Sequence, residues 1–237
     1  MLMVRAAGVL LCAAAALSGC ATQLTAQPPA GTSLAGAWKI DHGAGDDPQK
    51  TLEQMRAQAL KIISRQQSAP APAPMPARGA GTRGGGQTQE QAGVEDFAPA
   101  PVAPGGHRPD PLQRSPMAQV VRKCIARGEF LTIRQGPGEF VLDYGTSVRS
   151  FTPGAHSVVS AEGGVGDQLS GWDGRAYLIK VKAQSGPDVT EEFSLSADGK
   201  QLLYKLHIAA EELPAVTLTR VYIPTDEVAP RLLPNND

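Results

Sequence analysis

The sequence predicts a mainly β protein, folded as a curled antiparallel meander or barrel of about nine strands. Three turn signals, Asp173-Gly174, Gly186-Pro187 and Asp198-Gly199, recur at intervals of 13 and 12 residues. The runs between them alternate apolar and polar residues, which is typical of half-buried strands joined by hairpins. So many strands do not suit a flat sheet in a small domain, and curling removes exposed strand edges.

A first strand and a helix are expected in residues 34–66. Alternation over residues 34–40 predicts the strand. Asp46-Asp47 comes directly before Pro48. An acidic N-cap followed by proline at the first helical position is typical of a helix start. The helix is amphipathic, because apolar residues recur every three or four positions at Leu52, Met55, Ala59 and Ile62.

Residues 67–116 are expected to form a long disordered insertion. Ten prolines and eight glycines fall within residues 68–116, and Phe97 is the only Phe, Tyr or Trp among them. So little apolar surface cannot offset the entropy of ordering the chain. The alternating Ala-Pro pattern is typical of a spacer, and a segment that docks on a partner protein or contacts the cell wall is the alternative.

An antiparallel β domain is expected in residues 117–224, packed against residues 34–66. Residues 117–127 are expected to form one or two helical turns. Gly136-Pro137-Gly138 predicts a hairpin, whereas the Gly-Gly-Val-Gly run at residues 163–166 is interpreted as a flexible connection. The predicted strands cover residues 130–135, 139–144, 148–151, 169–172, 176–183, 189–195, 202–208 and 216–223, followed by a C-terminal tail over residues 225–237.

Two charged residues, Glu191 and Arg220, fall on strand faces that are otherwise apolar. Buried charges need partners. At least one of the two is therefore expected to be paired, to lie at a strand end, or to indicate the opposite strand register. Both registers stay open for the last strand: either Arg220 points inward with Tyr222, or Val221 points inward and Arg220 outward.

No residue pattern points to catalysis, to a metal or to a cofactor. The four histidines never approach metal-ligand spacing. No Lys-Ser/Thr follows the glycine run at residues 163–166, as a phosphate-binding loop requires. Cys124 has no base beside it and is expected to be buried. We therefore expect a non-catalytic protein. A net charge of -1 gives no electrostatic footprint for nucleic acid, so we expect no nucleic-acid partner.

The N-terminal residues have the order of an export signal that ends at a cysteine. Arg5 precedes an apolar run at residues 9–17, and Ser18-Gly19 leads directly to Cys20. This order resembles the lipobox of bacterial lipoproteins. The resemblance implies that residues 1–19 are a signal peptide and that the Cys20 sulfur carries a diacylglycerol thioether. An ordinary secretory signal with a cysteine at its cleavage site is the alternative.

Residues 20–33 are expected to form the lipidated cysteine and a polar tether. About 13 extended residues reach roughly 45 Å. Ala21 stands where an Asp would retain such a lipoprotein in the inner membrane, so the resemblance implies the periplasmic leaflet of the outer membrane. The expected partners are the membrane, through the anchor, and an envelope protein, the cell wall or a lipid. The whole layout is also similar to uncharacterised lipoproteins of Gram-negative bacteria.

Two short motifs mark the ends of the domain. Gly36-Ala37-Trp38 lies on the first strand and Thr219-Arg220-Val221-Tyr222 on the last. These motifs resemble those of the calycin barrels, the lipocalins and fatty-acid-binding proteins. Resemblance to lipocalins implies a cation–π contact between Arg220 and Trp38. Resemblance to fatty-acid-binding proteins implies a helical lid after the first strand and a ligand carboxylate held by Arg220 and Tyr222.

Two functions are consistent with these features. The first is a lipid-anchored, periplasm-facing envelope protein with a structural or interaction role. The alternative is a calycin-like carrier of a small apolar or amphipathic ligand, with Arg220, Tyr222 and Trp38 as the ligand-binding residues. A continuous interior cavity would favour the carrier, whereas an interior filled by Trp172, Phe193, Tyr204 and Leu206 would contradict it.

Overall fold

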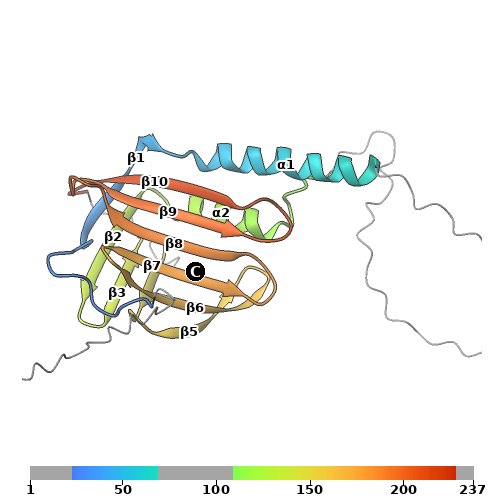
Figure 1. Cartoon of the computed structure of the whole chain (residues 1–237). Coiled ribbons are helices and arrows are strands. Elements are labelled where there is room, and N and C mark those ends of the chain that lie inside the picture. Colours follow the sequence, from blue (N-terminus) through green and yellow to red (C-terminus); the bar gives the residue numbers. More distant parts are fainter. Residues whose placement is uncertain (1–22, 69–108, 228–237) are drawn as a thin grey trace, which may run out of the picture.

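The computed structural model describes residues 23–68 and 109–227 as ten strands and two helices (Figure 1). β1 (Gly36–Gly45) is followed by α1 (Pro48–Ser68) and α2 (Pro116–Ala126). The remaining strands are β2 (Phe130–Gly136), β3 (Glu139–Asp143), β4 (Val148–Phe151), β5 (His156–Ala161), β6 (Gly164–Asp173), β7 (Ala176–Ala183), β8 (Asp188–Leu195), β9 (Leu202–Ala209) and β10 (Val216–Pro224).

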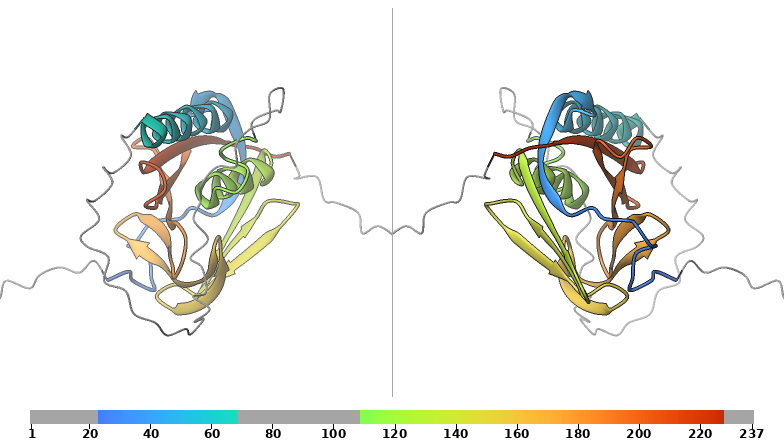
Figure 2. Two further views of the ribbon diagram at one scale, coloured as in Figure 1. Left: turned by 90° about the vertical axis from the view of Figure 1, so that its right-hand side faces the viewer. Right: turned by 90° about the vertical axis from the view of Figure 1, so that its left-hand side faces the viewer.

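All ten strands belong to one antiparallel sheet in the order β4-β3-β2-β1-β10-β9-β8-β7-β6-β5. β1 and β10 are the first and last strands in the sequence, yet they pair in the middle of the sheet. The sheet curls on itself (Figure 2). β4 and β5 are its two edges, and no ladder joins them in the described residues. The fold is therefore a curled, incompletely closed antiparallel barrel, which confirms the predicted fold class.

The two ends of the barrel carry different features. The turns at residues 137–138, 174–175 and 196–201 lie at one end, which we call the base. The turns at residues 162–163 and 184–187 lie at the opposite end, where β1 leads into α1 and α2 leads into β2. We call this the helix end, and Figure 1 shows the helices extending away from the base.

β5 is a tenth strand that the sequence pattern does not predict. It pairs with the first half of β6, so Gly164 and Gly166 belong to a ladder. The interpretation of residues 163–166 as a flexible connection is therefore wrong. A Cβ atom at Gly163 would collide with the Ser185 carbonyl in the facing turn. The glycine at this position thus allows two neighbouring turns to pack closely.

α1 begins where the acidic N-cap and proline predict. The Asp47 Oδ1 atom accepts a hydrogen bond from the backbone N–H of Gln49 at 2.8 Å, and Pro48 is the first helical residue. The predicted apolar stripe faces the core, with Leu52, Met55 and Ala59 buried and Ile62 packed beside them. The amphipathic helix after the first strand is confirmed.

α2 is a full helix of 11 residues, where the sequence predicted one or two turns. The Ser115 Oγ atom accepts a hydrogen bond from the Ala118 N–H at 3.2 Å, and Pro116 opens the helix. The Glu212 carboxylate accepts hydrogen bonds from the Ser115 hydroxyl at 2.8 Å and from the Met117 N–H at 3.1 Å. Ser115 and Pro116 lie at the end of the Pro/Gly-rich segment. The composition of that segment predicts disorder, which explains why the helix start was not recognised.

The chain is already packed against the domain before α2. Arg56 of α1 pairs with Asp110 at 3.0 Å, and the Leu112 side chain is fully buried. The predicted disorder therefore does not extend over residues 109–116. It is also wrong for residues 67–68, which are the last two of α1. Residues 69–108 of that segment, the signal peptide with Cys20, and residues 228–237 of the C-terminal tail lie outside the described residues.

The described part of the expected tether lies against the barrel. Thr25 forms a backbone bridge with Trp172 of β6, and Leu24 is only 5% exposed. Thr32 is also buried, at the other end of the segment. The expectation of a free tether is therefore wrong for residues 24–33. This stretch is polar and has no apolar periodicity, so no local pattern indicates the packing.

Candidate functional site

Large side chains fill the interior of the barrel. Trp172, Phe193, Tyr204 and Leu206 are each at most 2% exposed. The Phe140 ring meets Trp172 edge-on with centroids 5.9 Å apart, and the Phe193 and Tyr204 centroids are 4.9 Å apart. The side chains of Trp172, Phe193, Tyr204 and Leu206 fill the space that an interior ligand cavity would need. This part of the barrel is therefore a packed core.

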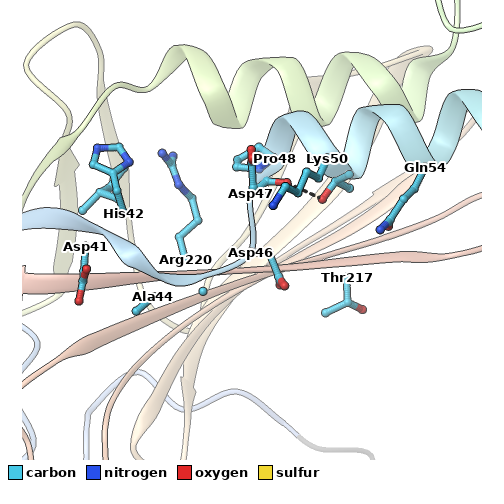
Figure 3. A pocket seen from close by; sticks show the side chains of 13 residues that line it. Asp41, His42, Ala44, Asp46, Asp47, Pro48, Lys50, Gln54, Thr217 and Arg220 are labelled. Atoms are coloured by element: carbon cyan, nitrogen blue, oxygen red, sulfur yellow. Dashed lines mark hydrogen bonds between the residues drawn. The ribbon is translucent and has the colours of Figure 1, made fainter.

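A groove of about 600 Å³ opens near the helix end. It lies between the last residues of β1, the first turn of α1, and Thr217 and Arg220 of β10 (Figure 3). Asp46 joins these elements: its N–H donates to the Thr219 carbonyl at 2.7 Å, and its carboxylate accepts from the Thr219 N–H at 2.7 Å. The start of α1 is thereby fixed to β10.

Arg220 lies at the inner side of this groove and is 9% exposed. It shares the inward face of β10 with Leu218 and Tyr222, which settles the register that the sequence left open. The Arg220 Nη1 atom donates to the Cys124 carbonyl oxygen at 3.0 Å. No carboxylate in the described residues forms an ion pair with it. Since a guanidinium has five N–H donors, most of those of Arg220 have no protein acceptor here.

Trp38 does not contact Arg220. β1 pairs Trp38 with Pro224 and Gly45 with Arg220, so the two side chains lie several residues apart along the sheet, with Trp38 nearer the base. The cation–π pairs of the described residues do not include these two. The predicted stacking of Arg220 on Trp38 is therefore wrong, and the contact implied by the lipocalin resemblance is not formed.

Tyr222 points inward beside Arg220 but lies one pleat nearer the base. It is 2% exposed and does not line the groove. Burial raises the pKa of its phenol, which stays protonated at neutral pH. Of the three predicted ligand-binding residues, only Arg220 therefore borders the groove.

Both acidic and basic side chains surround Arg220 in the groove. Asp46 and Asp47 accept hydrogen bonds from backbone N–H groups, which hold their carboxylates in place. Figure 3 shows His42 on one side of Arg220 and Lys50 on the other. His42 Nε2 lies 3.1 Å from Glu129 Oε1, so Arg220 and Lys50 supply the nitrogen donors of the groove, beside carboxylates that accept hydrogen bonds from the backbone.

A second group of buried charges lies inside the barrel around Glu191, and we call it the Glu191 cluster. Its other members are Arg127, Arg149, Tyr144 and Tyr204. Arg127 Nη1 donates to Glu191 Oε2 at 2.6 Å, and Arg149 Nη2 lies 2.9 Å from Oε1. The Tyr204 hydroxyl donates to Glu191 at 3.1 Å and accepts from Arg127 at 2.9 Å. The Arg127 guanidinium also lies over the Tyr144 ring at 5.4 Å.

The Glu191 cluster holds its carboxylate in the charged form. Burial alone would raise the pKa of Glu191, but the charges of Arg127 and Arg149 outweigh burial and hold this pKa well below its ordinary range. Burial and the Glu191 charge raise the pKa of the Tyr204 phenol, which therefore stays a hydrogen-bond donor. The cluster links the end of α2 to β4, β8 and β9, so its role is to hold the barrel together.

The sequence marked Glu191 as a buried charge in need of a partner but identified neither arginine. Arg149 alternates with the buried Phe151 on β4, and this two-residue period is the signal that could have placed Arg149 inside. Arg127 follows the last residue of α2 as its C-cap and reaches Glu191 only through the tertiary fold. No local pattern could have assigned it.

Cys124 is a free cysteine and 1% exposed, which confirms the predicted burial. Burial raises the pKa of its thiol, so the sulfur stays protonated at neutral pH. The described residues contain no group of three or more His, Cys, Asp or Glu side chains that could hold a metal ion. None of their helices has the length and apolar character needed to cross a membrane.

Neither a protein-family model nor a curated protein sequence matches the chain. Its structure is similar to the REP1-NXSQ fatty acid transporter, with 13% identity over 82% of this chain and 98% of that chain and a TM-score of 0.41. It is also similar to apo lipid binding protein 8 of Caenorhabditis elegans, with 12% identity, coverages of 83% and 100%, and a TM-score of 0.42. A fatty acid-binding protein from Drosophila melanogaster brain shares 18% identity over 40% of this chain and 70% of that chain, with a TM-score of 0.32.

Proposed function

We propose that this chain is a non-catalytic envelope lipoprotein whose barrel binds the acidic group of a small amphipathic molecule at Arg220. One observation carries the proposal: a guanidinium that is 9% exposed borders a groove of about 600 Å³ and has no carboxylate partner in the described residues. Burying a charge without a counter-charge is costly. A carboxylate or phosphate in the groove would supply that counter-charge.

The chemistry of the groove supports an oxyanion ligand. A guanidinium offers parallel N–H donors that match the two oxygens of a carboxylate or phosphate. The bond from Arg220 to the Cys124 carbonyl fixes the guanidinium and leaves its other donors available. Because Asp46 and Asp47 bind backbone N–H groups, their repulsion of an anion is reduced. Ile40 is the largest apolar side chain of the groove, whose other lining residues are mostly polar.

The proposal includes a lipid anchor on Cys20 in the periplasmic leaflet of the outer membrane. The order of Arg5, the apolar run, Ser18-Gly19 and Cys20 supports it. Two or three acyl chains are enough for stable attachment to one leaflet, whereas one chain is marginal. The ligand would then be a lipid or another amphipathic component of the envelope.

A structural or interaction role without a ligand is the second candidate. The filled interior favours it, because Trp172, Phe193 and Tyr204 occupy the space that an interior ligand cavity would need. In that case the domain would contact an envelope protein or the cell wall through its outer surface. Binding of charged and uncharged probes separates the two candidates.

Ligand binding can be measured by isothermal titration calorimetry at pH 7 on the full chain after signal removal, with Cys20→Ala to prevent lipidation. Hexanoate, hexyl phosphate and hexanol serve as probes, because they share an alkyl chain and differ in charge. We expect the two acids to bind and hexanol not to bind. Arg220→Gln should weaken acid binding about tenfold or more, because hydrogen bonds to charged groups contribute about 1.5–3 kcal/mol.

Arg134→Gln is the matched control for Arg220→Gln. Arg134 is an exposed arginine of β2 that pairs with Asp143 at 3.2 Å, away from the groove, so its loss should leave binding unchanged. Equal binding of hexanol and hexanoate, or acid binding that survives Arg220→Gln, would show that Arg220 is not the anion contact. Absence of binding by all three probes would support the structural role instead.

A further inference from the structure

The segment before β1, residues 24–34, is attached to the base of the barrel at both of its ends. At the first end, the Thr25 N–H donates to the Trp172 carbonyl at 2.8 Å and the Trp172 N–H donates back to the Thr25 carbonyl at 2.8 Å. Leu24, beside this bridge, is 5% exposed. The pair of bonds continues the pairing on this edge of β6 toward the base, beyond Leu169, which pairs with His156 at the start of β5.

The second attachment is to β2, on the other side of the base. The Leu34 N–H donates to the Gln135 side-chain oxygen at 3.1 Å, and the Gln135 amide donates to the Thr32 carbonyl at 3.4 Å. Leu34 itself is fully buried. The segment therefore crosses the base from β6 to β2, and Figure 1 shows it at the end of the barrel away from the helices.

Gly171 of β6 allows this segment to approach the strand closely. A Cβ atom at Gly171 would lie 2.9 Å from the Thr25 carbonyl oxygen and 3.0 Å from the Leu24 Cβ. Only glycine leaves room for so close an approach. The contact at the base is thus a specific packing arrangement with two backbone hydrogen bonds.

We infer that a lipid anchor on Cys20 holds the base of the barrel against the phospholipid surface and turns the Arg220 groove toward the aqueous side. The inference rests on the anchor in the proposed function. From Cys20 to Leu24 the chain spans four residues and at most about 14 Å, whereas a free tether to the first strand would reach roughly 45 Å. So short a connection prevents the barrel from turning over.

In this orientation the Arg220 groove faces away from the phospholipid surface. β1 begins at the base with Gly36, and its last residue, Gly45, lines the groove and pairs with Arg220. The groove opens near the helix end, between β1, α1 and β10. An acidic amphipathic ligand would therefore enter from the aqueous side and not laterally from the leaflet that holds the anchor.

The orientation can be measured by energy transfer from a label on the protein to an acceptor on lipid headgroups. The lipidated full chain is placed in phosphatidylethanolamine–phosphatidylglycerol vesicles. One variant carries Ala197→Cys at the base, and another carries Glu211→Cys in the β9–β10 loop at the helix end; both positions are exposed. Native Cys124 is buried and will not compete for the label. We expect clearly stronger transfer from the label at position 197.

Thr25→Pro tests whether the base contact sets this orientation. Proline lacks the N–H that donates to the Trp172 carbonyl, so the segment should detach and the two labels should give nearly equal transfer. Gln23→Pro is the matched control. Gln23 is exposed and makes no hydrogen bond in the described residues, so the difference between the labels should persist.

Three results would overturn the orientation. Membrane-bound protein whose two labels transfer equally, or whose position-211 label transfers more strongly, would refute the orientation alone. Persistence of the full difference in Thr25→Pro would show that the base contact does not set it. A chain that fails to float with the vesicles would remove the anchor and with it this part of the proposed function.

Discussion

The barrel contains two buried groups of charge that differ in how completely they are paired. Glu191 receives hydrogen bonds from Arg127, Arg149 and Tyr204, so its carboxylate is fully surrounded by donors. Arg220 donates to one carbonyl oxygen, that of Cys124, and forms no ion pair in the described residues. We call the Glu191 cluster the closed group, because its charges are paired with one another. We call Arg220 the open group, because it has no counter-charge and borders a groove.

The difference separates a structural role from a binding role. A buried ion pair with complete hydrogen bonding can be retained by a fold, but an unpaired buried cation works against folding. Sites that lower stability in this way are commonly places where the protein needs an unsatisfied group for function. Arg220 is therefore the stronger candidate for ligand contact, although Glu191 has more interactions.

Glu191→Gln should cause the largest loss of stability. Arg127 and Arg149 would stay buried without a carboxylate, at a cost of about 3–5 kcal/mol in the free energy of unfolding. Urea denaturation measures this loss. Glu192→Gln is the matched control, since Glu192 is the next residue on the outer face and pairs with Lys205 at 3.4 Å at the surface. Equal losses in the two variants would contradict the role of the cluster.

Acid should weaken the protein through the same carboxylate. The pKa of Glu191 is lower in the folded protein than its ordinary value of 4.5, so the unfolded chain takes up a proton first as pH falls. The stabilisation from Glu191 is complete above about pH 4.5 and is lost below it. Unfolding free energies measured between pH 7 and pH 3 should fall more steeply in the native chain than in Glu191→Gln. Parallel curves would count against this account.

Tyr204→Phe should have an intermediate effect. The change removes a hydroxyl that bridges Glu191 and Arg127, and hydrogen bonds to charged groups contribute about 1.5–3 kcal/mol. Tyr222→Phe is the comparison, because the Tyr222 hydroxyl has no hydrogen bond in the described residues and its loss should cost less. Thermal and urea unfolding of the two variants provide the measurement, and a larger loss in Tyr222→Phe would reverse the expected order.

Arg220→Met should change stability least, within about 1 kcal/mol in either direction. Methionine fills a similar volume and removes a buried charge that has no counter-charge, which offsets the lost bond to the Cys124 carbonyl. Acid binding should disappear in the same variant. A loss as large as that of Glu191→Gln would indicate that Arg220 has a structural role as well.

Local signals in the sequence predicted the elements that depend on neighbouring residues. Asp47 and Pro48 marked the start of α1, and the Asp-Gly and Gly-Pro turns marked the hairpins, because caps and turns are determined over a few positions. α2 was underestimated, since its Ser115 cap borders a Pro/Gly-rich segment and depends on Glu212 from a distant loop.

The site required information that no local pattern contains. Alternation allowed two registers for β10, and only pairing with β1 and β9 places Arg220 inside. Its distance from Trp38 depends on the register of the same ladder, which is why the stacking prediction failed. Arg127 and Thr25 also act through contacts with strands far away in sequence. Such long-range contacts are fixed by the whole fold.

The most direct test of the central claim is nuclear magnetic resonance of arginine side chains during titration with hexyl phosphate at pH 7. The open and closed groups of charge predict different responses. We expect the Arg220 guanidinium signals to shift with saturation while those of Arg127 and Arg149 stay in place. Shifts confined to Arg127 and Arg149, or no saturable shift at Arg220, would contradict the assignment of the groove as the binding site.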